Sequence, residues 1–225
     1  MVIEFVRSRR CSSAQAHDLL SCKPAHEITS RRVLAKEIMI TIVSGLPRSG
    51  TSLMMQMLQA AGMQVLSDGE RKADTDNPKG YLEWERIKQL PKDPSLIAEA
   101  EGKVVKVISQ LLLSIPDGHE YRVIFMQRPL PEVMKSQDEM LRRRGTYEPI
   151  ADTSPIEHAF QRHLVDVNKW LSAKENLKVM RVHYHRVLRE ARAVAEEVAQ
   201  FLGAPLQIEA MEQAVDKNLY RNRMK

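Results

Sequence analysis

The sequence has few aromatic residues and no long apolar run. Phe, Trp and Tyr make up 5% of the 225 residues, and they are not interleaved with Lys and Arg as a base-stacking nucleic-acid surface requires. No apolar stretch reaches the roughly 18 residues of a membrane span, and the first residues carry charges where a signal peptide would be apolar. We therefore expect no nucleic-acid partner, no membrane span and a cytoplasmic location.

Cysteine is also scarce, because Cys11 and Cys22 are the only two and both lie within residues 1–38. The rest of the chain therefore has neither a thiol nucleophile nor a cysteine-based metal site. The seven histidines form no HExxH motif, and His183 and His185, two residues apart, are expected on one face at the end of a strand. The sequence predicts no metal ion.

The net charge of +5 is modest and unevenly distributed. Residues 1–38 contain seven Lys and Arg against four Asp and Glu, which leaves a charge of about +2 for the remainder. A mildly basic body of this kind suits a small polyanionic ligand at least as well as a polynucleotide. The charge therefore directs attention to small anions.

The chain divides into a short polar segment and one long patterned segment. Residues 1–38 are irregular and dotted with arginine, and we expect a poorly ordered or peripheral N-terminal extension there. Over residues 39–225 apolar strand-like runs alternate with amphipathic helical periods, which predicts one three-layer α/β/α domain with a central parallel sheet. The glycine-bounded turn over residues 45–52, described next, makes the expected fold P-loop NTPase-like. The expected strands are 40–43, 63–66, 104–108, 121–126 and 178–184, and the expected helices are 51–61, 82–90, 131–143, 156–173 and 187–202.

A glycine-bounded turn over residues 45–52 joins the first expected strand to the first expected helix. Glycines let several backbone N–H groups point at one spot, and a helix N-terminus adds about half a positive charge there. Thr51 and Ser52 supply hydroxyls, and Arg48 supplies a permanent, planar cation. We therefore expect an anion cradle formed by Pro47, Arg48, Ser49, Gly50, Thr51 and Ser52.

The spacing of the two loop glycines matches the Walker A motif, but the next position does not. A P-loop nucleotide hydrolase carries Lys after the second glycine, whereas this chain carries Thr51 there and places its cation at Arg48. This arrangement argues against ordinary ATP hydrolysis.

A second candidate anion site follows the strand expected over 121–126. Arg128 stands just past its carboxyl end, on the same sheet edge as the cradle, and Ser136 lies in the helix that follows. A guanidinium and a hydroxyl suit one phosphate group. Taken alone the pair is weak evidence, because arginines often follow strands.

The two motifs in this order, Pro-Arg-Ser-Gly-Thr-Ser and then Arg-x7-Ser at a strand-to-helix junction, resemble those of the sulfotransferase superfamily. The form with Arg is similar to the protein-tyrosine and bacterial branches, and the likeness spans roughly residues 40–203. The resemblance implies an enzyme, a sulfotransferase that moves a sulfuryl group from its co-substrate 3′-phosphoadenosine 5′-phosphosulfate to a hydroxyl or amine acceptor. It implies that residues 47–52 hold the 5′-phosphosulfate and that Arg128 and Ser136 hold the 3′-phosphate.

The chain departs from the family pattern in two places. It lacks the RKGxxGDW segment that cytosolic members place over the nucleotide, and residues 219–223 offer either alternative cations or a solvated basic tail. The catalytic base is not evident, so two candidates stand. Glu70 comes first, because it follows Arg48 at a spacing similar to that of a Glu base in related branches, and Glu83 comes second. A solvated loop carboxylate is the alternative for each.

In the implied reaction Arg48 neutralises the charge that grows on the bridging oxygen and the departing phosphate. Thr51, Ser52 and the loop amides hold the rest, without a metal. Lys79 and the arginine run 142–144 either face an anionic acceptor or point to solvent.

Two other functions stay open. A P-loop kinase acting on a nucleotide or small molecule would need a Lys at position 51 and an Asp after the strand expected over 104–108, where Ser109 and Gln110 stand. A degenerate nucleotide-binding module would keep the cradle without catalysis. The sequence specifies neither the acceptor nor the oligomeric state.

Overall fold

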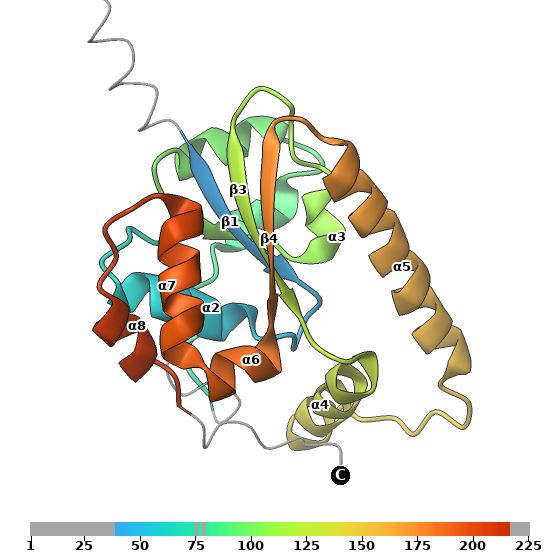
Figure 1. Cartoon of the computed structure of the whole chain (residues 1–225). Helices are drawn as coiled ribbons and strands as arrows, with labels where there is room; N and C mark the ends of the chain where they lie inside the picture. Colours follow the sequence, from blue (N-terminus) through green and yellow to red (C-terminus); the bar gives the residue numbers. More distant parts are fainter. Residues whose placement is uncertain (1–38, 75–76, 78–79, 217–225) are drawn as a thin grey trace, which may run out of the picture.

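The computed structural model describes residues 39–74, 77 and 80–216 (Figure 1). Within them four parallel strands form one sheet in the order β2-β1-β3-β4. The expected extension over residues 1–38, the basic segment 219–223 and Lys79 lie outside the described residues. The strands are β1 (Ile40–Gly45), β2 (Val104–Lys106), β3 (Tyr121–Gln127) and β4 (Leu177–His183).

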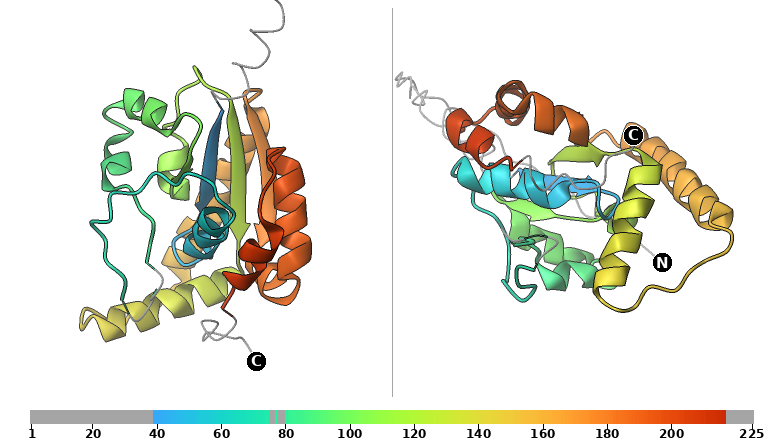
Figure 2. Two further views of the ribbon diagram at one scale, coloured as in Figure 1. Left: turned by 90° about the vertical axis from the view of Figure 1, so that its left-hand side faces the viewer. Right: turned by 90° about the horizontal axis from the view of Figure 1, so that it is seen from below.

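Helices connect these strands and cover both faces of the sheet, as Figure 2 shows. β1 and β2 are buried along their whole length, which is the pattern of strands with helices on both sides. The prediction of a three-layer α/β/α fold around a parallel sheet is confirmed. The helices are α2 (Thr51–Ala60), η1 (Glu85–Gln89), η2 (Pro94–Ala100), α3 (Ser109–Leu112), α4 (Leu130–Arg143), α5 (Ser154–Ala173), α6 (Tyr184–Arg189), α7 (Ala191–Leu202) and α8 (Ile208–Gln213), of which η1 and η2 are 3-10 helices.

The face covered by α2, α6, α7 and α8 is rich in methionine. Met54, Met55 and Met57 of α2 are fully buried and pack in one cluster with Val43 of β1 and Val194 of α7. Methionine is unbranched and fills irregular gaps between a helix and a sheet. This packing holds the first turn of α2 directly beyond the carboxyl end of β1.

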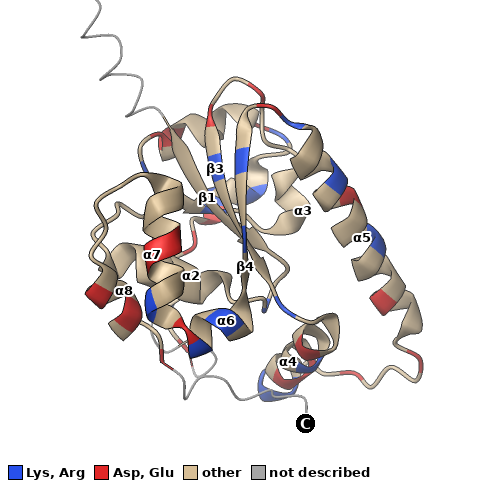
Figure 3. Ribbon diagram, viewed as in Figure 1, with Lys and Arg blue, Asp and Glu red and all other residues tan. Residues whose placement is uncertain are grey.

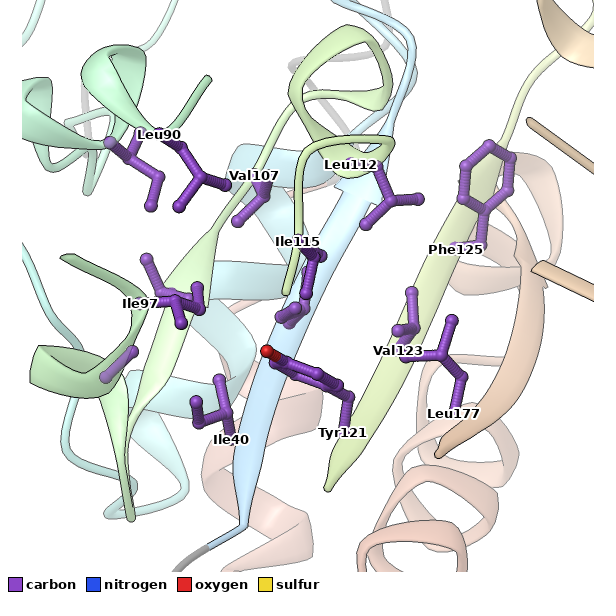
Figure 4. Close-up of a cluster of buried hydrophobic side chains, with 14 of the residues drawn as sticks. Ile40, Leu90, Ile97, Val107, Leu112, Ile115, Tyr121, Val123, Phe125 and Leu177 are labelled. Atoms are coloured by element: carbon purple, nitrogen blue, oxygen red, sulfur yellow. The ribbon is translucent and has the colours of Figure 1, made fainter. Parts of the chain in front are cut away.

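The opposite face is covered by η1, η2, α3 and α5 (Figure 4). Tyr121 and Phe125 of β3 point into this core, and Ile97 of η2 and Leu112 of α3 close it. The Tyr121 hydroxyl donates a hydrogen bond to the Pro116 carbonyl at 2.8 Å, so its one polar atom is satisfied inside an apolar cluster.

Helix α4 has a different position from the others. It lies across the carboxyl-terminal edge of the sheet rather than along a face (Figures 1 and 2). Pro129 precedes its first turn and Pro131 lies within that turn, where a missing N–H costs no helical hydrogen bond. Across this edge the helix passes the loop that follows β1, where Arg48 contacts Ser136 of α4.

Three expected elements differ in the structure. No strand forms over 63–66, where Val65 makes only an isolated bridge to Val104. The expected helix over 82–90 is the short 3-10 helix η1. The helix expected over 187–202 is two helices, α6 and α7, because the backbone of Glu190 leaves the helical region with φ −128° and ψ 45°.

Candidate active site

The loop between β1 and α2 needs both of its glycines. Gly45 has φ +147°, and a Cβ added there would meet the Ser49 hydroxyl at 2.5 Å and the Met126 carbonyl at 2.7 Å. Gly50 has φ +100°, and a Cβ there would meet the Tyr184 ring at 2.5 Å. Both dihedrals lie in the left-handed region that glycine tolerates best. The loop is therefore held close to β3 and α6, with α2 starting directly behind it.

The two arginines predicted to bind anions contact each other's segments. Arg48, with φ +69°, donates from Nε to the Ser136 hydroxyl at 3.0 Å. Arg128 donates from Nη1 to the Arg48 carbonyl oxygen at 3.1 Å. Residues 80 or more positions apart in the sequence thus meet at the carboxyl-terminal edge of the sheet.

These residues line a cavity of about 420 Å³. Of the predicted site residues, Ser49 is an exception: it is 1% exposed, it does not line the cavity, and its N–H donates to the Leu46 carbonyl. Figure 3 shows Lys and Arg positions on α4 and α6, near this edge of the sheet. The predicted residues that line the cavity are Pro47, Arg48, Gly50, Thr51, Ser52, Glu83, Arg128 and Ser136.

Arg128 is held by a buried carboxylate. Its Nε donates to Glu132 Oε2 at 3.0 Å, and the two side chains are 7% and 3% exposed. His185 Nε2 lies 2.8 Å from the same oxygen, and the Tyr184 ring lies 4.7 Å from the guanidinium carbon. Burial opposes ionisation of Glu132, yet hydrogen bonds from His185 and Arg128 keep its pKa below the ordinary value. The guanidinium is thereby fixed between α4, α6 and the loop.

Lys106, at the end of β2, is a site residue that the sequence analysis missed. It is 5% exposed, and its Nζ donates at 2.9 Å to the Ser52 hydroxyl, the Tyr81 carbonyl and Glu83 Oε1. Burial lowers the pKa of Lys106 below its ordinary value, although Glu83 opposes this. The available signal was a lysine inside an otherwise apolar β-branched run.

Glu83 lies in the cavity wall, whereas Glu70 does not. Arg71 donates from Nη1 to both Glu83 oxygens, at 3.1 and 2.9 Å, and Lys106 contacts the same carboxylate. Burial works against ionisation, but Lys106 and Arg71 keep the pKa of Glu83 below its ordinary value of 4.5. Glu70 is exposed on the loop and does not line the cavity, so its position does not favour it as the base.

The segment that carries Glu83 is anchored to α2. Gln56 Nε2 donates to Asn77 Oδ1 and to the Gly80 carbonyl, each at 2.9 Å. The Tyr81 hydroxyl donates to Asp74 at 2.8 Å, and burial together with this bond raises the pKa of Tyr81. These contacts fix one wall of the cavity.

Other predicted features fall outside the cavity or have structural partners. His183 is exposed and His185 contacts Glu132, so the two do not form a pair. Within residues 39–74, 77 and 80–216 no group of three or more His, Cys, Asp or Glu side chains could hold a metal ion. No helix in the same ranges has the length and apolarity to cross a membrane. Of the arginine run, Arg143 and Arg144 line the cavity, while the Arg142 guanidinium stacks on Tyr147 at 4.0 Å.

Part of the chain matches the model of a known protein family. Residues 140–225 match the family model described as Sulfotransferase domain. Among solved structures, the "Sulfotransferase Domain from the Curacin Biosynthetic Pathway" is similar at 14% sequence identity and a TM-score of 0.47, with 79% of this chain and 77% of that chain covered. No match was found among curated proteins.

The matched range begins after Ser136, so it contains neither the loop at residues 47–52 nor Arg128. It covers the C-terminal part of the fold, including β4, α6 and α7. The two anion motifs and the family match thus come from separate parts of one chain. Residues 140–225 are therefore similar to a sulfotransferase domain, and they lie in the same parallel three-layer fold as the two motifs.

Proposed function

We propose that the chain is a sulfotransferase, that its donor is 3′-phosphoadenosine 5′-phosphosulfate and that its acceptor is a hydroxyl compound. The observation that carries the proposal is the contact between the two motifs: Arg48 reaches Ser136, Arg128 reaches the Arg48 carbonyl, and all three residues line one cavity. A ligand with two phosphate groups on one ribose needs two cationic sites within a single cavity. A nucleotide without a 3′-phosphate has no use for the second site.

In this proposal the loop and the start of α2 hold the 5′-phosphosulfate. Arg48, Thr51 and Ser52 contribute side chains there, and the N-terminus of the ten-residue α2 contributes its partial positive charge. Arg128 and Ser136 hold the 3′-phosphate. Ser136 then exchanges the hydrogen bond from Arg48 for one to a phosphate oxygen.

The transfer step forms one bond and breaks one. The acceptor oxygen attacks sulfur as the bond from sulfur to the bridging oxygen breaks, and the electron pair stays on that oxygen, which becomes part of the 5′-phosphate. The acceptor proton passes to Glu83, and the products are a sulfate ester and adenosine 3′,5′-bisphosphate. Arg48 and Lys106 stabilise the negative charge that develops, because a cation in a water-poor site acts more strongly than in solution.

Glu83 is the proposed base because it is the predicted carboxylate in the cavity wall. Its lowered pKa means that it is ionised, and hence able to accept a proton, at neutral pH. The same ion pairs with Arg71 and Lys106 that lower the pKa make it a weak base. They also fix its position, and position is the larger contribution in a transfer of this kind.

The test is ligand binding by the intact chain. We expect adenosine 3′,5′-bisphosphate to raise the melting temperature and ATP with Mg²⁺ to leave it unchanged. Ser136→Ala and Arg128→Ala should each weaken bisphosphate binding at least about tenfold, since each removes a phosphate contact. Arg189→Ala serves as the matched control, because Arg189 is exposed and lies outside the cavity.

Two results would contradict the proposal. Stabilisation by ATP with Mg²⁺ rather than by the bisphosphate would favour the kinase. Bisphosphate binding without sulfate-ester formation on a broad acceptor panel would favour a nucleotide-binding module without catalysis. Circular dichroism of each variant separates loss of binding from loss of folding.

A further inference from the structure

Arg128, the cation proposed to hold the 3′-phosphate, has a defined orientation in the structure. Its Nε donates to Glu132 Oε2 at 3.0 Å, and its Nη1 donates to the Arg48 carbonyl oxygen at 3.1 Å. The Tyr184 ring lies 4.7 Å from the guanidinium carbon. A planar guanidinium binds a phosphate best when its N–H groups point at the phosphate oxygens, so its orientation matters for the ligand.

Glu132 has to be held in turn, because its carboxylate is only 3% exposed and is costly to bury without hydrogen bonds. His185 Nε2 lies 2.8 Å from Glu132 Oε2, the same oxygen that accepts from Arg128. Burial opposes the ionisation of Glu132, but the hydrogen bonds from His185 and Arg128 keep its pKa below the ordinary value. An ionised carboxylate can only accept hydrogen bonds, so Nε2 of His185 is the donor.

The register of the sheet brings these side chains together. Gln127 at the end of β3 pairs with His183 at the end of β4, so the segments that follow the two strands leave the sheet side by side. Arg128 follows the first strand, and His185 lies in the first turn of α6, which follows the second. Glu132, in the first turn of α4, contacts both. Residues from three segments thus meet at one carboxylate oxygen.

His185 has no place in the cavity wall. Its side chain is 34% exposed and does not line the cavity, whereas Arg128 does. The imidazole can therefore affect a bound phosphate through Glu132 and Arg128 but not by direct contact. Without the hydrogen bond from His185, the buried carboxylate would compete with a ligand phosphate for the N–H groups of Arg128, because both are anions that accept from a guanidinium.

Resting on the proposed function, we propose that His185 is a positioning residue for the 3′-phosphate: it holds Glu132, and Glu132 holds the Arg128 guanidinium in the orientation that binds the phosphate. In the proposed function the 5′-phosphosulfate lies against a different part of the cavity, at the loop after β1. The effect of His185 is therefore confined to the 3′ end of the donor.

The test compares the binding of two nucleotides to the intact chain by isothermal titration calorimetry. Adenosine 3′,5′-bisphosphate carries both phosphates, and adenosine 5′-monophosphate lacks the one assigned to Arg128. His185→Phe keeps a ring and removes the nitrogen donor. We expect this variant to weaken bisphosphate binding about five- to tenfold and to change monophosphate binding less than about twofold, because a hydrogen bond that supports only the 3′ site is lost.

Two further variants separate positioning from a structural role. His185→Gln should restore bisphosphate affinity to within about twofold of the wild type, since its amide nitrogen replaces Nε2 as a donor to Glu132. His183→Phe is the matched control and should leave binding unchanged, because His183 is exposed and outside the cavity lining. Equal losses of both nucleotides in His185→Phe, without rescue by glutamine, would overturn the proposal. Should His185→Phe fail to fold by circular dichroism, His185→Asn takes its place, because its amide is one bond too short to replace Nε2.

A double-mutant cycle tests whether His185 acts through Arg128. In the Arg128→Ala background, His185→Phe should change bisphosphate affinity less than about twofold, because the group that it positions is gone. A loss of equal size in the two backgrounds would show that His185 reaches the ligand by another route, which contradicts the proposal.

Failure of this inference and failure of the proposed function give different results. If the wild type prefers the bisphosphate over the monophosphate and Arg128→Ala removes that preference, the proposed donor site stands, and an unchanged His185→Phe protein overturns the positioning role alone. If the wild type does not bind the bisphosphate, the proposed function and the role of His185 fail together.

Discussion

Replacing Glu132 by glutamine tests whether the buried network around Arg128 holds the site together. Glutamine has the same shape and keeps an acceptor oxygen, but it removes the charge that faces a guanidinium only 7% exposed. Hydrogen bonds to charged groups contribute about 1.5–3 kcal/mol each, so we expect a loss of about 2 kcal/mol in the free energy of unfolding. For a domain of this size that corresponds to a fall of about 4–8 °C in melting temperature.

The matched control is Glu196→Gln. Arg192 and Glu196 have the same i,i+4 spacing as Arg128 and Glu132, but their side chains are 53% and 57% exposed. An exposed pair of this kind contributes about 0.5 kcal/mol or less. The control should therefore lower the melting temperature by no more than about 2 °C.

The loss of stability caused by Glu132→Gln should become smaller at acidic pH. The folded-state pKa of Glu132 is lowered, so its stabilising contribution is complete above the ordinary value and is lost as the pH falls through the folded-state pKa. The difference between the wild-type and Glu132→Gln proteins should thus be constant near neutrality and shrink below about pH 4. Urea titrations at a series of pH values measure it.

Two results would contradict the role given to Glu132. Equal destabilisation by Glu132→Gln and Glu196→Gln would show that burial of the Arg128 network adds nothing. A destabilised Glu132→Gln protein that still binds adenosine 3′,5′-bisphosphate with wild-type affinity would show that Glu132 supports the fold without positioning Arg128 for its ligand.

Three other substitutions have defined outcomes. Glu83→Gln should lower kcat at least about 100-fold with little change in bisphosphate affinity, whereas Glu70→Gln should leave kcat unchanged; the reverse order in steady-state assays would move the base to Glu70. Lys106→Met should cost about 3 kcal/mol in urea unfolding because it leaves Glu83 without one buried cation, and a neutral effect would contradict the pairing. Gly50→Ala should abolish bisphosphate stabilisation in thermal shift, since its Cβ would meet Tyr184 at 2.5 Å, and retained binding would show that the loop adapts.

The sequence alone determined the layers of the fold and the position of the glycine-bounded loop at residues 45–52. β1 begins with four β-branched residues, and β3 has an unbroken apolar run over residues 123–126; these local patterns are enough to predict a buried parallel sheet. The loop at residues 45–52 could also be predicted from a local pattern. Its glycines, hydroxyls and arginine are contiguous, and the position after a strand places them at the ligand-binding edge.

The local sequence pattern did not predict the correct secondary structure where contacts with a neighbouring element decide the conformation. Residues 63–66 have the composition of a strand but border β2 through only one bridge, so no strand forms. The segment 187–202 has continuous helical periodicity, yet it bends at Glu190 so that α6 follows the sheet edge and α7 covers its face. Tertiary packing overrides propensity in both cases.

The direct contacts between distant side chains in the cavity were decided by tertiary structure. Lys106 contacts Glu83 from 23 positions away, and Arg48 contacts Ser136 from 88 positions away. The separation between such residues in space depends on how the sheet orders its strands and on where α4 crosses its edge, and neither is encoded within a window of a few residues. The pairing of buried Lys106 with Glu83 and the contact of Arg48 with Ser136 therefore became visible only in the folded chain.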